Sequence, residues 1–267
     1  MNSEITPVFI FTRGRTGSTA IIDELKSHSR IQFHGELFRP NPLAREDVRV
    51  AYEKMGENYL SLGLTNDRAL PYLLHKQLYG GDTQKYLDYL RTDVDISGKN
   101  CVGFKLLGNH LETSENLLPQ LSKQNAKCIH LVRKNVIKQV VSGFFAREAG
   151  IYNRRNYVPE IKEIDIPIEA FISRIKANLS GVQANRDILQ KNGINYLDVY
   201  YESFCKERSV FYNAIFEFLG LEAEDLTPTD WSIMTPADKM LVSNFDDLID
   251  ALNKNGLNDL IKIFEGD

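Results

Sequence analysis

The sequence predicts an α/β fold in which a parallel sheet is covered by helices on both faces. Short apolar segments recur along the chain, and helical patterns separate them. Segments that are nearly continuous in Val, Ile, Leu and Phe are typical of strands buried on both faces. Strands that alternate with helices form parallel sheets. We therefore expect a P-loop-like three-layer sandwich with a central parallel sheet of four or five strands and a helical insertion.

The elements can be placed in order from these patterns. Strands are expected at residues 8–11, 31–33, 102–107, 128–132 and 194–200. Helices are expected after Gly17 and at residues 115–123, 136–147, 168–189, 209–219 and 245–264. The segment 41–95 is helical in pattern and long for a simple crossover, so we interpret it as an insertion that shapes a site. Residues 152–167 carry mixed charges and two prolines, which indicates a loop.

Composition restricts the class of protein. The chain has 267 residues, 43% of them hydrophobic and 25% charged, with a net charge of −4. This is ordinary globular composition, and we expect a single domain over residues 1–267. The mild acidity argues against nucleic acid as a partner. No apolar run approaches the roughly 18 residues of a membrane span, and the first apolar segment, 8–11, is too short for a signal peptide.

Cysteine usage points to a reducing compartment. The three cysteines, Cys101, Cys128 and Cys205, are odd in number and have no metal-ligand spacing. We expect free thiols, a cytoplasmic protein and no bound metal. The oligomeric state is left open.

A phosphate-binding turn is predicted after the first strand. The segment TRGRTGST, residues 12–19, joins that strand directly to a helix. Backbone N–H groups at a helix start face an anion, and the helix dipole favours negative charge there. The loop of nucleotide triphosphatases has a lysine before its Ser or Thr, and Ser18 stands in that place here. A cation is still present at Arg15, and an ordinary tight turn is the alternative.

A second cationic position follows the strand at 128–132. Arg133 comes directly after this strand, and Ser142 lies nine residues further on, about two turns into the next helix. Ligands of open α/β sheets bind at the carboxyl ends of the strands. An ATP-type enzyme would carry a metal-holding Asp near this point, so an arginine here favours an anion. A surface charge cluster is the alternative.

Together these segments resemble the sulfotransferases that use 3′-phosphoadenosine 5′-phosphosulfate (PAPS). RTGST at 15–19 resembles the family's 5′-phosphosulfate loop, and the pair of Arg133 and Ser142 resembles its 3′-phosphate site. Further segments agree: GELF at 35–38 and the Y-E-S stretch with its helix at 199–221. GFKLLGNHL at 103–111 and SNFDDL at 243–248 resemble the bacterial carbohydrate and Nod-factor-like branch.

The resemblance implies transfer of a sulfuryl group to a hydroxyl by in-line displacement, with release of 3′-phosphoadenosine 5′-phosphate (PAP). No metal is required. We expect Arg15 on the leaving-group side, where charge develops. The resemblance places the remaining donor contacts on Thr16, Gly17, Ser18 and Thr19 for the 5′-phosphate, Arg133 and Ser142 for the 3′-phosphate, and Tyr201 near the adenine.

The catalytic base is left open between three residues. Glu36 matches the glutamate of the carbohydrate branch, His110 resembles the histidine of the cytosolic branch, and His34 is the third candidate. Lys105 is a candidate for stabilising the sulfuryl oxygens.

Other functions stay open as well. The acceptor is expected to be a carbohydrate, a lipid-linked glycan or a small metabolite. The alternatives are a P-loop kinase of small molecules, a nucleotide-binding module without catalysis, and an interaction protein that uses 41–95.

Overall fold

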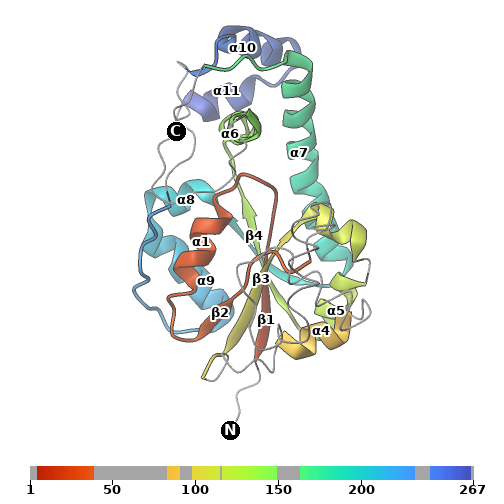
Figure 1. Ribbon diagram of the computed structural model, residues 1–267, viewed down its shortest axis with the longest axis vertical. Coiled ribbons are helices and arrows are strands. Elements are labelled where there is room, and N and C mark those ends of the chain that lie inside the picture. Colours follow the sequence, from red (N-terminus) through yellow and green to blue (C-terminus); the bar gives the residue numbers. More distant parts are fainter. Residues whose placement is uncertain are drawn as a thin grey trace, which may run out of the picture.

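A computed structural model describes residues 5–38, 83–90, 98–114, 116–148, 163–231 and 241–265. Its centre is a parallel sheet of five strands in the order β2-β3-β1-β4-β5, which confirms the predicted α/β fold (Figure 1). The strands are β1 (Thr6–Thr12), β2 (Ile31–Phe33), β3 (Cys101–Leu107), β4 (Lys127–Val132) and β5 (Asn195–Tyr200).

Helices cover both faces of this sheet. One face carries α1 (Ser18–Leu25), α8 (Tyr201–Lys206) and α9 (Arg208–Leu219), and the other carries α4 (Thr83–Leu90) and α5 (Leu117–Lys123). A short 3₁₀ helix, η5 (Gly108–Thr113), follows β3. Beyond the carboxyl ends of the strands lie α6 (Val136–Glu148), α10 (Phe245–Lys254) and α11 (Asn258–Glu265), as Figure 1 shows. The long helix α7 (Ile168–Lys191) runs from this upper group down beside the sheet.

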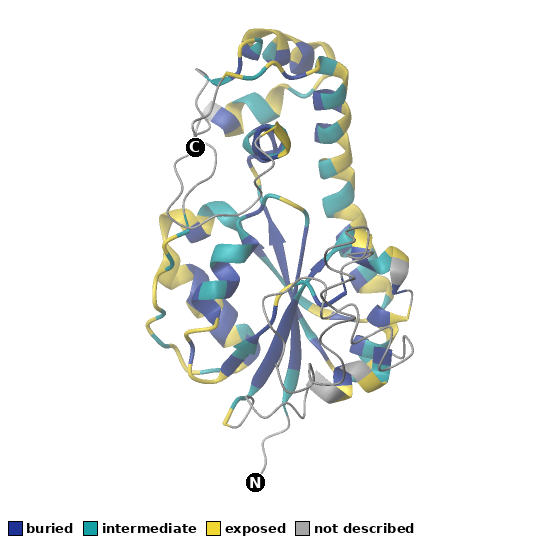
Figure 2. Cartoon of the chain, in the orientation of Figure 1, coloured by how far each residue is buried: buried dark blue, intermediate teal, exposed yellow. Residues whose placement is uncertain are grey.

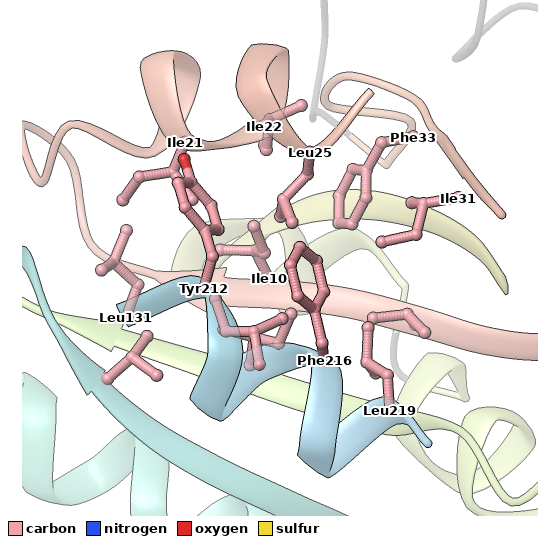
Figure 3. Packing of buried hydrophobic residues seen from close by; sticks show 14 of the residues in the cluster. Ile10, Ile21, Ile22, Leu25, Ile31, Phe33, Leu131, Tyr212, Phe216 and Leu219 are labelled. Atoms are coloured by element: carbon pink, nitrogen blue, oxygen red, sulfur yellow. The ribbon is translucent and has the colours of Figure 1, made fainter. Parts of the chain in front are cut away.

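Alternation along the strands builds the core on each face. In β1, Phe9 and Phe11 pack with α5, whereas Ile10 packs with α1 and α9. Figure 3 shows Ile10 among the apolar side chains of the two helices that cover it. Both sets of side chains are fully buried, and β1, β3 and β4 are dark blue along most of their length in Figure 2, whereas the edge strand β5 is mostly of intermediate exposure. Burial on both faces explains why these strands have nearly continuous apolar sequences.

Helix α7 joins two separate cores. Near its start, Phe171 and Ile175 pack with α6, α10 and α11 in a cluster beyond the sheet. Near its end, Leu189 packs against the sheet itself. One rigid helix therefore fixes the upper group of helices relative to the ends of the strands, which is where the predicted site residues lie.

The sequence-based elements agree with the structure except at a few points. The helix expected at 245–264 is two helices, because the chain turns at Gly256 in the left-handed region with a φ of 69°. Helices η5 and α8 were missed, since both are short. Most of the insertion expected at 41–95 and of the loop at 152–167 lies outside the described residues; α4 falls within the former. That residues 1–267 form one domain stays a prediction.

The topology places the carboxyl end of β1 at the centre of the sheet edge. After β1 the chain crosses to β2 on one side, and after β3 it crosses over β1 to β4 on the other side. Ligands of open α/β sheets bind where the strand order reverses in this way. The turn after β1 and the residues that follow β3 and β4 therefore meet at the expected position.

A buried histidine in β4 makes the fold sensitive to acid. His130 is 1% exposed, and its Nδ1 lies 2.6 Å from Asp198 Oδ1 on β5. Arg186 of α7 donates to the other oxygen of Asp198. Burial lowers the pKa of His130 from its ordinary value of 6.5, although Asp198 acts in the opposite direction.

We expect the free energy of unfolding to fall as the pH drops below about 6.5, because the unfolded chain then binds a proton that the folded chain resists. Above that pH the effect is absent. Urea unfolding at a series of pH values measures it. In His130→Asn the acid slope should be shallower by up to about 1.4 kcal/mol per pH unit. An unchanged slope would show that His130 does not control this dependence.

Candidate functional site

The turn between β1 and α1 has an unusual backbone. Arg15 has a φ of 65° and Gly17 a φ of 72°, so two left-handed residues occur within three positions. A non-glycine residue in this region costs on the order of 1–3 kcal/mol and persists only where its surroundings hold it. Gly17 is the N-cap of α1 and has no side chain to cap the helix. The first N–H groups of α1 are therefore suited to an anion.

The hydroxyl groups of Thr12 and Thr16 stabilise this turn by hydrogen bonds to neighbouring backbone. Thr12 Oγ1 donates to the Leu131 carbonyl of β4 at 2.7 Å and lies 2.7 Å from Thr16 Oγ1. Thr16 Oγ1 is also 3.1 Å from the Arg13 carbonyl oxygen, and Thr16 is 2% exposed. The Thr16 hydroxyl thus stabilises the turn from inside, and the predicted contact of Thr16 with the 5′-phosphate stays a prediction. Its backbone N–H remains a candidate for the phosphate.

The structure brings the predicted donor-site residues together around this turn. Arg15 donates from Nε and Nη2 to Ser142 Oγ of α6, at 3.2 and 3.1 Å. Arg133 Nη1 donates to the Arg15 carbonyl at 3.1 Å. The guanidinium of Arg133 also stacks on Tyr201, with Cζ 4.7 Å from the ring centroid. These four residues come from three distant parts of the sequence, because Arg133 and Ser142 are only nine residues apart.

Tyr201 lies directly against the turn. A Cβ placed on Gly17 would lie 2.3 Å from Tyr201 Cε2, so only glycine leaves room for the ring. Burial raises the pKa of Tyr201 to about 12, which keeps its hydroxyl protonated at neutral pH. Arg133 Nε is buried and has no hydrogen-bond partner in the structure. A buried, unsatisfied guanidinium N–H is a donor that an anionic ligand could satisfy.

Two residues that support this cluster were not predicted. Glu202 accepts hydrogen bonds from the backbone N–H groups of Lys134 and Asn135, at 3.1 and 3.0 Å, and so binds the start of α6. Gln139 of α6 donates to the Gly14 carbonyl at 2.7 Å. The Y-E-S stretch was a visible signal for Glu202, whereas Gln139 has no local signal.

A second group of predicted residues lies at the ends of β2 and β3. Lys105 Nζ donates to Glu36 Oε1 at 2.9 Å, and His110 Nε2 lies 3.8 Å from Glu36 Oε2. The side chains of Lys105 and His110 are 11% and 1% exposed, so Lys105 is not a surface lysine. Glu36 therefore lies between two groups that can carry positive charge. The third candidate base, His34, is also buried.

The hydrogen bonding of His110 restricts its chemistry. The backbone N–H of Leu107 donates to His110 Nδ1 at 3.2 Å. A neutral imidazole has one acceptor nitrogen, so this bond assigns the lone pair to Nδ1 and the proton to Nε2. In that tautomer His110 has no lone pair left for a substrate proton. Its Nε2 lies 3.8 Å from Glu36 Oε2.

The described residues give two further findings. Among them, no three His, Cys, Asp or Glu side chains are grouped so that they could hold a metal ion. None of the helices described here combines the length and the apolar character needed to cross a bilayer.

Comparison with known proteins gives similarity at the level of structure alone. No protein-family model and no curated protein sequence matches the chain. The chain is similar to the sulfotransferase domain of the Synechococcus PCC 7002 olefin synthase, with 19% identity, a TM-score of 0.49, and coverage of 92% of this chain and 84% of that one. It is also similar to mouse sulfotransferase SULT7A1, solved with PAP, with 12% identity, a TM-score of 0.47, and coverage of 97% and 84%.

A sulfotransferase from Alicyclobacillus acidocaldarius is similar at 15% identity and a TM-score of 0.43, over 94% of this chain and 96% of that one. All of these solved structures are sulfotransferases. The likeness to the Nod-factor branch stays a prediction. Likeness at these identities does not define an activity, so the function has to be argued from the residues of the site.

Gly17→Ala should damage the turn, because the new Cβ meets the Tyr201 ring and the residue must keep a positive φ. We expect a loss of about 1–3 kcal/mol in the free energy of unfolding, measured with urea. Gly14→Ala is the matched control, since a Cβ there meets nothing within 4 Å. It should stay within about 0.5 kcal/mol of the wild type. Equal effects in the two variants would contradict this account of the turn.

Proposed function

We propose that this protein transfers the sulfuryl group of PAPS to a hydroxyl of a carbohydrate, a lipid-linked glycan or a small metabolite. The observation that carries the proposal is the meeting of Arg15, Arg133 and Ser142 at an uncapped helix start. PAPS has two separate anionic groups, a 5′-phosphosulfate and a 3′-phosphate. The backbone turn after β1 suits the 5′-phosphosulfate, and the Arg133 guanidinium suits the 3′-phosphate.

The donor fits the residues present. The amides of residues 15–19 would hold the 5′-phosphate, as the sequence resemblance implies. The buried Arg133 Nε, which has no partner in the structure, would gain one from the 3′-phosphate. Ser142 Oγ accepts from Arg15, and the sequence resemblance assigns this hydroxyl to the 3′-phosphate. Tyr201, which stacks on Arg133, would present its ring beside the nucleotide.

The proposed reaction is a single displacement at sulfur. An oxygen of the acceptor hydroxyl forms the new O–S bond, while the bond from sulfur to the bridging phosphate oxygen breaks. The electron pair of that bond stays on the phosphate, which leaves as PAP. The acceptor proton passes to a base on the protein. Cations near the bridging oxygen stabilise the charge that develops there.

Glu36 is the base that the hydrogen bonding favours. The acceptor nitrogen of His110 is occupied by the Leu107 N–H. Glu36, by contrast, has two oxygens and is 21% exposed, so a substrate hydroxyl can reach it. In this proposal His110 packs beside the Glu36 carboxylate, and Lys105, which donates to Glu36 Oε1, also stabilises the sulfuryl oxygens.

The first experiment is calorimetric titration with PAP beside ATP and AMP. Selective binding of PAP supports the proposal. Preference for ATP with magnesium would favour the alternative function, a P-loop kinase of small molecules. Binding of PAP without turnover of PAPS over a broad set of hydroxyl acceptors would indicate a nucleotide-binding module without catalysis.

Arg133→Ala should weaken PAP binding at least tenfold, because a charge-assisted pair to the 3′-phosphate is lost. Binding of adenosine 5′-phosphosulfate, which lacks that phosphate, should change much less. Lys134→Ala, which removes the neighbouring exposed cation, is the control. Equal weakening of both nucleotides by Arg133→Ala would contradict the assignment of this arginine.

Glu36→Gln should lower kcat by about 10²–10⁴-fold and leave PAP affinity unchanged, because the base is lost while the donor site is intact. His110→Asn is the comparison, since its Oδ1 can still accept the Leu107 N–H, and it should retain most of the activity. Steady-state rates with PAPS measure both. If Glu36→Gln keeps near wild-type kcat, the base is another residue.

A further inference from the structure

Two arginines beside the turn have no role in the donor site described above. Arg13 is half-buried, and its Nε donates to Asn178 Oδ1 of α7 at 2.9 Å. Arg174, one turn earlier on α7, is also half-buried, with Cζ 4.1 Å from the ring centroid of Phe144. Within the described part of the chain, neither guanidinium has a carboxylate at ion-pair distance. Desolvation lowers the pKa of Arg13, as expected for a buried cation without a counter-charge.

Both arginines keep hydrogen-bond donors available. Arg13 uses Nε for Asn178, which leaves the N–H groups on its two terminal nitrogens. Arg174 stacks on Phe144 with the face of its guanidinium, and stacking leaves all the in-plane N–H groups unused. A planar fork of this kind matches carboxylate, phosphate and sulfate oxygens. The two guanidinium groups are therefore suited to an anion that the described residues do not supply.

The packing of Arg13 depends on a glycine of α7. A Cβ placed on Gly181 would lie 1.8 Å from Arg13 Nη1 and 2.4 Å from its Cζ. The guanidinium thus lies close against the helix backbone at Gly181. Glycine in a helix interior costs about 1 kcal/mol relative to alanine, so its presence here has a packing reason. Because position 181 has no side chain, the Arg13 guanidinium can pack in this one place against α7.

One face of α7 connects the two groups of the candidate site. Residues 174, 178, 181 and 185 recur at helical spacing and share this face. At its start, Arg174 Nη1 and Arg15 Cγ both lie beside Gly143, where an added Cβ would be 3.9 Å from each. At its end, Asn185 Oδ1 would be 3.8 Å from a Cβ on Gly108, the residue after β3. His110, beside Glu36, follows in the same short helix.

We propose that Arg13 and Arg174 bind an anionic group of the acceptor, so that the acceptor is a hydroxyl compound that also carries a carboxylate, phosphate or sulfate. This rests on the proposed function. The two cations lie along the α7 face that runs from the donor-side arginine to the end of β3, near the proposed base. An acceptor that reaches Glu36 with its hydroxyl and this face with its anion would be oriented at two points.

The test separates this anion site from the donor site. The full chain is saturated with PAP, and inorganic sulfate, inorganic phosphate and acetate are titrated in turn by calorimetry. We expect at least one of them to bind without displacing PAP, and Arg13→Gln and Arg174→Gln each to weaken that binding at least tenfold. The anion that binds most tightly identifies the group.

Two further variants distinguish position from charge. Gly181→Ala leaves every charge in place but forces Arg13 to move, and it should also weaken anion binding while the helix stays folded. Lys191→Gln removes an exposed cation from the last turn of α7 and should have no effect.

Each other outcome overturns the inference in a distinct way. An anion that displaces PAP would assign the two arginines to the donor site and leave the proposed function intact. Absence of anion binding, or equal loss in Lys191→Gln, would remove the acceptor site alone. If PAP itself does not bind, the proposed function fails and the acceptor assignment fails with it.

Discussion

The site depends on one constraint, the left-handed turn that joins β1 to α1. Arg15 and Gly17 both have a positive φ, and contacts from distant segments hold them there. Tyr201 fills the space that a side chain at position 17 would need, and Arg133 binds the carbonyl of Arg15. The strain of the turn is thereby offset by the packing that also assembles the cations. The same contacts that fix the backbone for an anion bring the side chains that would bind it.

Two cations beside the turn, Arg13 and Arg174, have no carboxylate at ion-pair distance within the described part of the chain. Glu202, which follows Tyr201, has both of its carboxylate oxygens engaged with backbone N–H groups at the start of α6. Glu36 is engaged with Lys105. Keeping these two half-buried arginines without a nearby carboxylate is unfavourable in the free protein, and an anionic ligand would remove that cost. This imbalance in a chain of net charge −4 is a physical reason to expect polyanionic ligands.

The features that could be predicted from the sequence are those that depend on short stretches of the chain. The strand and helix pattern, the glycine at the helix start and the spacing from Arg133 to Ser142 are local features, and the structure brings that pair together with Arg15. The tautomer of His110 could not be predicted, because it depends on a backbone N–H whose position follows from a short 3₁₀ helix. The role of Gly181 was equally hidden, since a glycine inside a helix has meaning only when its packing partner is known.

Helix α7 explains why a distant element can matter for a site built on strand ends. Its first turns pack in the upper cluster through Phe171 and Ile175, and its last turns pack on the sheet through Leu189. A helix fixed at both ends cannot slide or rotate without disrupting one core or the other. The polar face between these two anchors is therefore held in a constant relation to the turn after β1. A rigid helix face of this kind can select acceptors by the distance between their anionic group and their reacting hydroxyl. Flexible loops would define that distance less sharply.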